Sequence, residues 1–399
     1  MHVIVDRKHK ISVLCLLLDT KKNTNMTELE PKLSFIVPAR LSTKYLISTI
    51  RNLLDSFDMR YEVVLSLNNG TTPVPKAIRN IRDNRLRIFT PKSNLSMAKN
   101  WFNGLANSSG EWICFVGSDD GVVSSNISKF IDIAEEQVDL DVITNHNIAF
   151  TYSSFDKVAW ANLPINAPSG LRAEVDWPIR LASLFPQFTY DMPQPYSKAL
   201  VRRKIFEPLL ERESEIPGCA PDIYLGNYVA IASKKGLYVD EILTIRGTSS
   251  ISIGSQIFSN RKLSRSAKEI MDDFNSKSFL YPLQSIFGVT CRPAISMDYY
   301  NLVKNNESLL NRKINVAWCQ LSCLDSIHHP KMRFAKSITN IIYKIGLAFR
   351  KIWFWKNFRF NVARDHKTIM PNDTDMFKLS RILSDPKWLI EIAGKTGSK

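Results

Sequence analysis

The stretch that decides the fold is Gly110-Glu111-Trp112-Ile113-Cys114-Phe115-Val116-Gly117-Ser118-Asp119-Asp120-Gly121. Its apolar run, Trp112 to Val116, has the length of a short buried strand and ends in two adjacent carboxylates and a glycine. Ligands of open α/β sheets bind at the carboxyl ends of the strands. Two carboxylates there suit a hard divalent cation, which takes oxygen ligands and in turn holds phosphates. The simpler interpretation is a strand followed by a solvated Asp-Gly turn.

Upstream of this stretch, segments with strand and helix periodicity alternate. The pattern predicts strands over 33–38, 61–67, 86–89 and 112–116, separated by helices over 43–57, 78–82 and 97–107. Such alternation predicts a parallel sheet with helices on both faces. No GxGxxG or Walker A sequence occurs, so neither a dinucleotide-binding fold nor a P-loop is indicated.

Composition bounds the class of protein. A chain of 399 residues with 44% hydrophobic and 23% charged residues predicts one large globular domain plus an extension. The net charge of +15 indicates an anionic partner: nucleic acid, anionic lipid or a phosphorylated substrate. The six cysteines form no C-x-x-C pair and Cys114 lies inside the apolar strand. Free thiols in a reducing compartment are therefore favoured over a disulfide framework.

Four segments resemble, in order and spacing, the family 2 glycosyltransferases of the GT-A fold. They are Ser34–Pro38, Glu62–Gly70, Asn94–Trp101 and Gly110–Asp120. The third is similar to the family's Asn-x-Gly-x-x-x-Ala-Arg-Asn helix start, and the fourth to its Gly-Glu-Tyr-Ile-x-Phe-Leu-Asp-x-Asp-Asp signature. The resemblance implies an α/β fold, a GT-A (Rossmann-like) mixed sheet flanked by helices, over residues 32–255. Residues 32–125 would form its nucleotide-binding half and 126–255 its acceptor half.

The chain departs from the family's pattern at two places. The second strand, which commonly ends in Asp-Asp-Gly, ends here in Asn68-Asn69-Gly70, and the first Asp of the acidic triplet is Gly117. Asparagine still offers a donor and an acceptor to a base or ribose edge. Asp119 becomes the expected first ligand of Mg²⁺ or Mn²⁺ and Asp120 the second, with diphosphate oxygens and waters filling the shell.

A second carboxylate site is expected at Pro217–Leu225, which resembles the family's Glu-Asp or Pro-Asp pair at a helix start. The resemblance implies that Asp222 is the general base of an inverting transfer, removing the proton from an acceptor hydroxyl. The other interpretation is a cap of a helix over 223–232, where the helix dipole favours a carboxylate. One residue can serve as both. Arg246 with Ser249 to Ser252 resembles the family's closing loop over the diphosphate.

The resemblance also implies a set of contacts to a nucleotide sugar, most simply a UDP-sugar. These residues are Pro38, Ala39, Arg40, Asn68, Asn69, Asn94, Lys99, Asn100, Ser118, Asp119 and Arg246. Arg202 and Arg203 have two interpretations, a solvated helix start and a diphosphate contact.

The two ends of the chain have their own character. Residues 1–31 are expected to be a peripheral leader that can be disordered, and residues 256–399 a helical C-terminal extension. Within the extension, residues 331–367 carry ten Lys and Arg against one acid, Asp365, with apolar residues and tryptophans at helical spacing. Such a basic amphipathic segment fits an anionic membrane surface. The alternatives are a helix packed on the catalytic domain and, with less support, nucleic-acid binding.

These observations predict a glycosyltransferase that moves a sugar from a nucleoside-diphosphate sugar to a hydroxyl acceptor, either lipid-linked or a growing polysaccharide. We expect it in the cytoplasm, peripherally associated with the inner face of the cell membrane, in surface-polysaccharide assembly. The alternative is a catalytically weak homologue, a sugar-nucleotide-binding or membrane-associated scaffold, because of Gly117 and Asn68-Asn69. Turnover of a labelled sugar nucleotide separates the two.

Overall fold

The computed structural model describes residues 30–40, 44–68, 70, 73–164, 172–175, 193–217, 220–253, 256, 268 and 365–385. The predicted leader, residues 1–31, lies almost wholly outside these ranges. Among the cysteines, Cys114 is described and is a buried free thiol. In the described ranges, no helix is both long and apolar enough to cross a bilayer.

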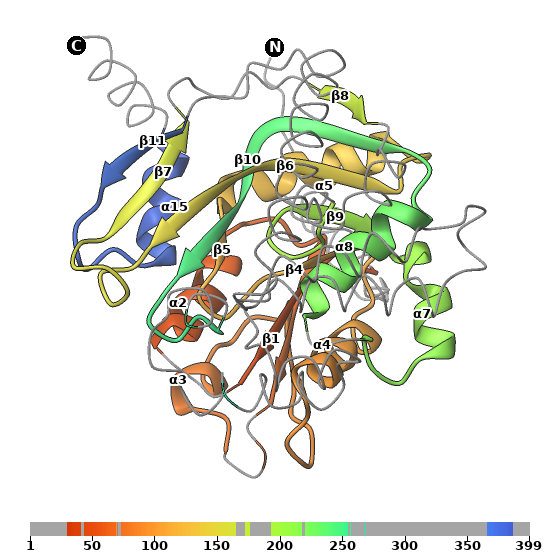
Figure 1. Ribbon diagram of the computed structural model, residues 1–399, viewed down its shortest axis with the longest axis horizontal. Coiled ribbons are helices and arrows are strands. Elements are labelled where there is room, and N and C mark those ends of the chain that lie inside the picture. The colour runs from red at the N-terminus through yellow and green to blue at the C-terminus, as the bar shows by residue number, and fades with distance from the viewer. Residues whose placement is uncertain are drawn as a thin grey trace, which may run out of the picture. The chain divides into compact units, whose positions relative to one another are not determined.

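The half predicted to bind the nucleotide, residues 32–125, is built on four parallel strands (Figure 1). They are β1 (Leu33–Ala39), β2 (Tyr61–Leu67), β3 (Leu86–Phe89) and β4 (Trp112–Phe115), in the spatial order β4-β1-β2-β3. The connecting helices are α2 (Lys44–Leu53), α3 (Lys76–Arg79) and α4 (Met97–Ala106). The strands and helices predicted for this half are confirmed. The helix predicted to reach Phe57 ends at Leu53, however, and Phe57 is fully exposed.

The second half turns the sheet into a mixed one. Strand β9 (Ala199–Arg202) runs antiparallel between β4 and β6 (Val142–Thr151), while the long β10 (Gly236–Thr248) lies parallel to β6. Three short strands complete this half: β5 (Gly121–Val122), β7 (Trp160–Pro164) and β8 (Arg172–Val175). The helical elements are η1 (Ser124–Asn126), α5 (Ile127–Glu136), η3 (Arg203–Ile205), α7 (Glu207–Arg212) and α8 (Pro221–Ala232). The predicted mixed sheet flanked by helices is confirmed.

The described part of the C-terminal region belongs to the same sheet. Strand β11 (Asp365–Ile369) pairs antiparallel with β7, and helix α15 (Met376–Ser384) follows and packs against α2. The prediction of one basic helix over 331–367 is therefore wrong for its last three residues, which lie in a strand. Lys367 there stacks on a strand neighbour, with its ammonium 4.3 Å from the centre of the Trp160 ring. The rest of that segment, 331–364, lies outside the described residues.

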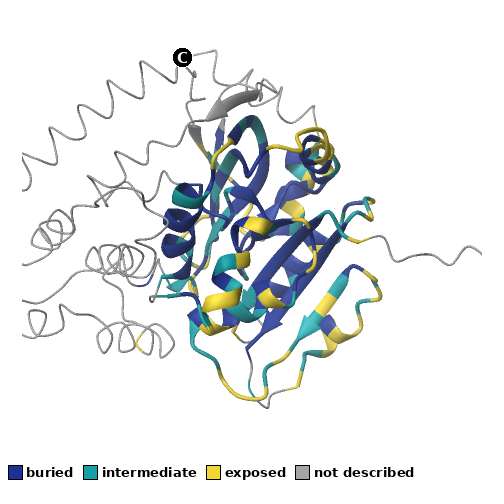
Figure 2. Ribbon diagram, turned by 90° about the vertical axis from the view of Figure 1, so that its right-hand side faces the viewer, coloured by how far each residue is buried: buried dark blue, intermediate teal, exposed yellow. Residues whose placement is uncertain are grey.

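The core lies on both faces of the sheet (Figure 2). Successive residues of a strand point to opposite faces. In β1, Phe35 and Val37 accordingly join the cluster that includes Leu46 and Ile50 of α2, while Ile36 joins the cluster that includes α4 and α8. All three β1 side chains are fully buried. The sheet is thus rigidly held from both sides, and its carboxyl edge is a fixed platform for polar groups.

Candidate active site

Strand β4 ends next to the two carboxylates that the sequence singles out. The backbone N–H of Val116 donates to Ile36 O at 2.8 Å, which continues the parallel pairing just past the end of β4. Asp119 and Asp120 follow in a tight turn and are 7% and 0% exposed. The interpretation of a solvated Asp-Gly turn is therefore wrong, since both side chains are buried.

Both oxygens of Asp120 are held by protein donors. Oδ2 accepts from the Gly117 N–H at 3.0 Å and from the Ser197 hydroxyl at 2.8 Å, and Oδ1 accepts from the Gly247 N–H at 2.6 Å. The phenol of Tyr196 lies beside this carboxylate, and burial together with the charge of Asp120 raises the pKa of Tyr196 well above its ordinary value. Asp120 therefore joins the turn after β4 and the segment before β9 to β10, and it can bind a cation only by giving up some of these hydrogen bonds.

Asp119 is less completely compensated. Its Oδ2 accepts from the hydroxyls of Ser249, at 2.7 Å, and of Ser252. Burial and the neighbouring charge of Asp120 raise the pKa of Asp119 to about 6, although the two serine hydroxyls act in the opposite direction. The loop Ser249 to Ser252, predicted to lie over a diphosphate, is thus brought to the acidic pair.

Gly117, the position where the resemblance leads one to expect a carboxylate, has no room for a side chain. A Cβ atom there would lie 2.5 Å from the Tyr196 hydroxyl and 2.7 Å from Asp120 Oδ2. The volume that a carboxylate at 117 would need is already filled by a phenol and by Asp120. The absence of a carboxylate at position 117 is therefore accompanied by a second change, because Tyr196, which precedes β9, fills the space that the carboxylate would need.

The third carboxylate, Asp222, lies in the first turn of α8. The helix begins at Pro221 after Ala220, whose side chain makes no capping bond, and Asp222 is half-buried. Burial raises the pKa of Asp222, while a hydrogen bond from the Ile223 N–H and the charge of Arg246 offset part of the rise. Tyr196 interacts electrostatically with Asp119, Asp120 and Asp222. All three carboxylates are therefore close enough to influence the pKa of the same phenol.

Two cations reach the same region. Arg246, on β10, is half-buried and its Nε is enclosed without a hydrogen-bond partner among the described residues. Burial and the charge of Arg246 lower the pKa of Lys198 to about 8. A buried guanidinium N–H without a protein partner is suited to an oxygen of an anionic ligand.

The described residues match a known family over much of this fold. Residues 34–207 match the model described as Glycosyl transferase family 2. This segment of the chain is therefore a domain of the Glycosyl transferase family 2. A search of curated proteins finds no match to the sequence.

Solved structures similar to this glycosyltransferase include that of S. aureus TarS, with 16% identity and a TM-score of 0.44. The match covers 74% of this chain and 53% of that one, so the present chain spans about half the length of that relative. TarS 1–349 in complex with UDP-GlcNAc is 14% identical, with a TM-score of 0.44, and the match covers 86% of this chain and 98% of that one.

The amides predicted to contact a nucleotide sugar are engaged within the glycosyltransferase itself. Asn68 donates to Leu95 O and accepts from Leu95 N–H, both at 2.8 Å, which fixes the entry to α4. Asn100 accepts from the Ser66 hydroxyl and donates to Ser66 O at 3.1 Å. Asn69 lies outside the described residues. As placed, Asn68 and Asn100 shape the binding edge, and their contact with a nucleotide stays a prediction.

The other predicted contacts lie along the same edge. Pro38 and Ala39 end β1 and Arg40 follows it, Asn94 lies against Gly70, and Lys99 is exposed in the first turn of α4. Ser118 precedes the acidic pair, and its carbonyl accepts from Thr49 at 3.2 Å. The structure thus brings the described members of the predicted set to one edge of the sheet, while their roles remain predictions.

Arg202 and Arg203 fit neither interpretation offered by the sequence. Arg202 is buried, pairs with Glu111 and lies with its guanidinium 4.5 Å from the centre of the Trp112 ring. Arg203 donates to Gly110 O at 2.7 Å. Both therefore bind the start of β4, at the amino edge, and neither is a solvated helix start or reaches the carboxylates at the opposite end.

Sequence reasoning missed several residues of the site. Tyr196 and Ser197 belong to no motif that the sequence shows, and neither does Tyr152, whose hydroxyl donates to Asp119 O at 3.2 Å. Ser197 is the one non-glycine residue in the described part of the chain with a left-handed backbone, at φ 46°. No local pattern marks it, since serine is not typical of that conformation.

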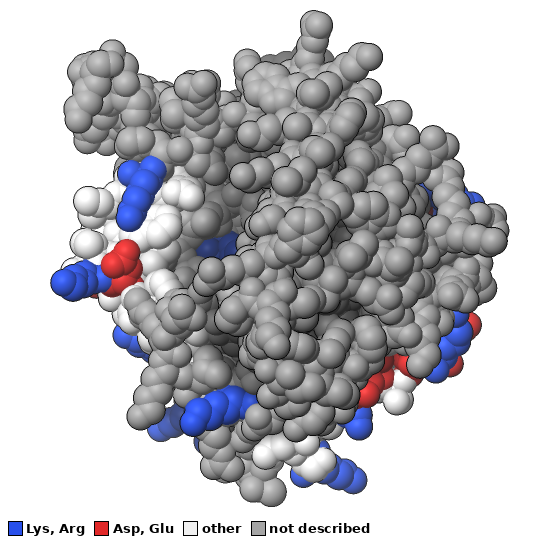
Figure 3. Space-filling model, viewed as in Figure 1, with Lys and Arg blue, Asp and Glu red and all other residues white. Residues whose placement is uncertain are grey.

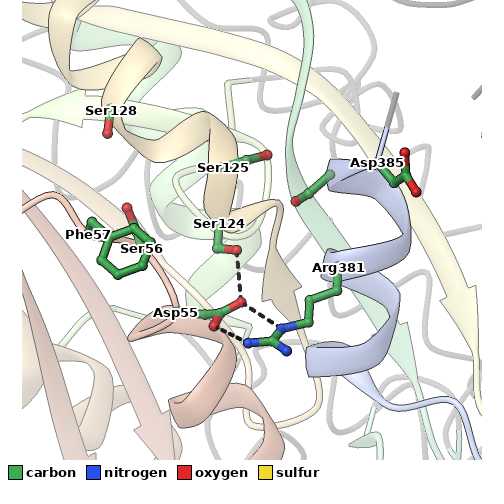
Figure 4. Close-up of a pocket in the computed structure, with 9 residues that line it drawn as sticks. Asp55, Ser56, Phe57, Ser124, Ser125, Ser128, Arg381 and Asp385 are labelled. Atoms are coloured by element: carbon green, nitrogen blue, oxygen red, sulfur yellow. Dashed lines mark hydrogen bonds and ion pairs between the residues drawn. The ribbon is translucent and has the colours of Figure 1, made fainter. Parts of the chain in front are cut away.

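The described residues also enclose a separate cleft of about 380 Å³ (Figure 4). It is lined by Asp55, Ser56, Phe57, Ser124, Ser125, Ser128, Arg381, Ser384 and Asp385. Arg381 of α15 points to Asp55 across it, at 3.0 Å. The cleft shares no residue with the carboxylate site of the glycosyltransferase.

Proposed function

We propose that this glycosyltransferase moves a sugar from a nucleoside-diphosphate sugar to a hydroxyl acceptor in one displacement that inverts the anomeric carbon. The observation that carries the proposal is the electrostatics of one sheet edge. Asp119 and Asp222, both with raised pKa values, act on the same region as the enclosed Nε of Arg246. Perturbed carboxylates of this kind gather where protons and phosphates are handled.

Asp222 is the proposed general base. A base works best when its pKa approaches the working pH, and burial moves the pKa of Asp222 in that direction. Its place in the first turn of α8 fixes the carboxylate on a rigid element. Asp222 would accept the proton of the acceptor hydroxyl as that oxygen attacks, while Arg246 would bind the diphosphate that leaves.

Asp119 is the proposed contact to a cation. No cluster of three or more His, Cys, Asp or Glu that could hold a metal ion occurs within the described ranges. The donor set instead fits an ion shared between Asp119, diphosphate oxygens and water, because Asp120 already has protein donors on both oxygens. When bound, Mg²⁺ or Mn²⁺ neutralises charge developing on the leaving diphosphate. Asp120 would support Asp119 from behind rather than join it.

The test is turnover of labelled sugar nucleotides, with UDP-GlcNAc first in the panel and Mn²⁺ present. Asp222→Asn should lower turnover by about 10²–10⁴-fold and leave donor binding nearly unchanged. Glu207→Gln is the matched control, because it neutralises an exposed acid in the first turn of the neighbouring helix α7. Full activity of Asp222→Asn would leave Asp222 only the favourable position of a carboxylate in the first turn of α8, where Ala220 and not Asp222 is the N-cap residue. No turnover of any donor, even to water, would favour the scaffold alternative.

We further propose that the acceptor is lipid-linked or a growing polysaccharide, and that the basic segment 331–364 holds the enzyme on an anionic membrane. The sequence supports this, since each Lys or Arg near such a surface contributes about 1 kcal/mol. On the face seen in Figure 3, the described Lys and Arg lie in separate groups, some beside acids. These separate groups do not form a continuous basic surface on that face, so the segment 331–364 stays our candidate for the membrane contact.

Deleting the segment together with everything after it would remove β11 and α15, so substitution is the sharper test. Lys331, Arg333, Lys336 and Lys344 would be changed to Gln, with Lys76, Arg79, Arg82 and Lys92 changed in the control. Co-sedimentation with anionic vesicles should fall for the first variant only. Equal sedimentation of the two variants would remove the case for this segment.

A further inference from the structure

Two consecutive residues converge on the same carboxylate at the end of β4. The Ser197 hydroxyl donates to Asp120 Oδ2 at 2.8 Å, and the Tyr196 hydroxyl lies beside the same oxygen, next to the point where a Cβ of residue 117 would lie. In an extended chain, neighbouring side chains point to opposite faces and would not meet one partner. The left-handed backbone at Ser197, φ 46°, breaks this alternation. A non-glycine residue held in that region commonly marks a functional constraint.

The backbone around these residues is fixed from both sides. The Phe115 N–H donates to Pro195 O at 2.7 Å, and the Ser197 N–H donates to Phe115 O at 2.8 Å. Thr244 of β10 donates to Ser197 O at 2.8 Å. The Tyr196 ring lies 5.3 Å, centre to centre, from Trp101, which itself stacks on Phe115 at 4.7 Å. The phenol is thus positioned by packing and its hydroxyl is aimed over Gly117.

Gly117 completes the arrangement by leaving the space open. Its missing side chain lets the Tyr196 hydroxyl and Asp120 Oδ2 come within 2.5 and 2.7 Å of where a Cβ would lie. The three residues therefore form one unit, which we name the Tyr196–Gly117–Asp120 unit. A side chain at 117 and the phenol of Tyr196 exclude each other.

We propose that Tyr196 is a positioning residue of the transfer reaction: with Ser197 it keeps Asp120 turned into the protein, so that Asp119 alone faces the diphosphate. The inference rests on the proposed function, and it gives Tyr196 a role that acts through Asp120. It also predicts that Gly117 and Tyr196 depend on one another, which a merely structural tyrosine would not require.

The decisive variant is Tyr196→Phe, which keeps the ring packing and removes the hydroxyl. We expect kcat to fall about ten- to a hundredfold, with the donor KM nearly unchanged, because small misplacements of a reacting group have effects of that size. The matched control is Tyr61→Phe, since the Tyr61 hydroxyl is also buried but donates to Leu53 O, at 2.6 Å. Both variants should lose stability, and only Tyr196→Phe should lose kcat.

A double-mutant cycle tests the mutual dependence. Gly117→Ala should lower kcat in the wild type, and it should cost less in the Tyr196→Phe background, where the hydroxyl it displaces is gone. Strictly additive losses, or equal kcat for Tyr196→Phe and wild type, would overturn the positioning role while leaving the proposed function standing. A wild-type protein that turns over no sugar nucleotide would instead overturn the proposed function itself, and this inference with it.

Discussion

The two edges of the sheet hold buried carboxylates in opposite ways. At the amino edge, Glu62 accepts from the Ser34 hydroxyl at 2.7 Å and pairs with Arg87 at 2.6 Å, and Asp141 pairs with Lys204 at 2.8 Å. At the carboxyl edge, Asp119 and Asp120 lie side by side and receive hydrogen bonds from hydroxyls and backbone amides. In the described residues, the first edge therefore pairs its charges and the second does not.

The pKa values reflect this difference. Burial alone would raise the pKa of Glu62, but hydrogen bonds from Ser34, Ser109 and Arg87 outweigh it and hold the pKa below its ordinary value. For Asp119, burial and the charge of Asp120 together raise the pKa to about 6. Charge at the amino edge thus stabilises the fold. At the carboxyl edge, the ionised carboxylate of Asp119 is unfavourable in free energy. A bound cation or a proton from the substrate would offset that cost.

Among substitutions that compare the two edges, Asp119→Asn should have the largest effect. Losing a contact to the cation is expected to slow transfer on the order of a hundredfold or more. Stability should not fall, because the change removes a charge that Asp120 repels. Transfer rate and denaturation midpoint would be measured beside Asp139→Asn, the same substitution at an exposed acid. Near-normal turnover of Asp119→Asn in saturating Mn²⁺ would contradict the assignment.

Glu62→Gln should show the reverse pattern. It removes a buried charge that accepts several hydrogen bonds, so the free energy of unfolding should fall by about 1.5–3 kcal/mol. Transfer per folded molecule should stay unchanged, since Glu62 lies at the edge away from Asp119. Denaturant unfolding and transfer at a temperature well below the midpoint provide the two readings. A loss of turnover without a loss of stability would mean that the two edges are not functionally separate.

Acid should weaken the amino edge in a defined window. The folded-state pKa of Glu62 is below its unfolded value of about 4.3, so its contribution is complete above that pH and is lost as the pH falls through the lowered pKa. The unfolding free energy of the wild type should therefore drop more steeply below about pH 4.3 than that of Glu62→Gln. Parallel curves for the two proteins between pH 5 and 3 would count against the paired state of Glu62.

The smallest effect is expected from Arg381→Ala. Its ion pair with Asp55 joins α15 to the segment that follows α2, but the Arg381 side chain is 63% exposed, and exposed pairs contribute little. The denaturation midpoint should hardly change, and transfer should be unaffected. A clear drop in either would show that the cleft around Arg381 bears on the carboxyl edge.

How far the sequence predicts this site depends on how local each contact is. The strand predicted over 112–116 and the position of Asp119 just past its end follow from one contiguous pattern, and both are confirmed, with the strand ending at Phe115. The partners of Asp120 do not, because Ser197 lies 77 positions away and Gly247 lies 127 positions away. No sequence pattern around Ser197 predicts the left-handed backbone conformation that directs its side chain to Asp120.

The prediction of a basic helix over 331–367 failed at its end for another reason. Its basic residues dominate the pattern over 331–367 and indicate a helix, whereas the short segment after Arg364 pairs with β7. An edge strand with a Lys stacked on Trp160 looks, in sequence, like the end of an amphipathic stretch. Pairing between strands so distant in the chain is set by the folded sheet rather than by local propensity.

Helix α15 has a consequence for the order in which the enzyme matures. Met376 packs beneath Gly121 and Gly247, within 3.1 and 2.9 Å of where their Cβ atoms would lie, and the Ser380 hydroxyl accepts from Ser124 N–H across 256 positions of chain. Chains emerge from the ribosome amino end first and fold as they appear. The half built on β1 to β4 can therefore form early, while the backing of its acidic pair arrives only when α15 has been synthesised. A nascent chain stalled before that point would display the carboxylates on an unsupported turn, so competence for transfer should appear only after α15 has left the ribosome.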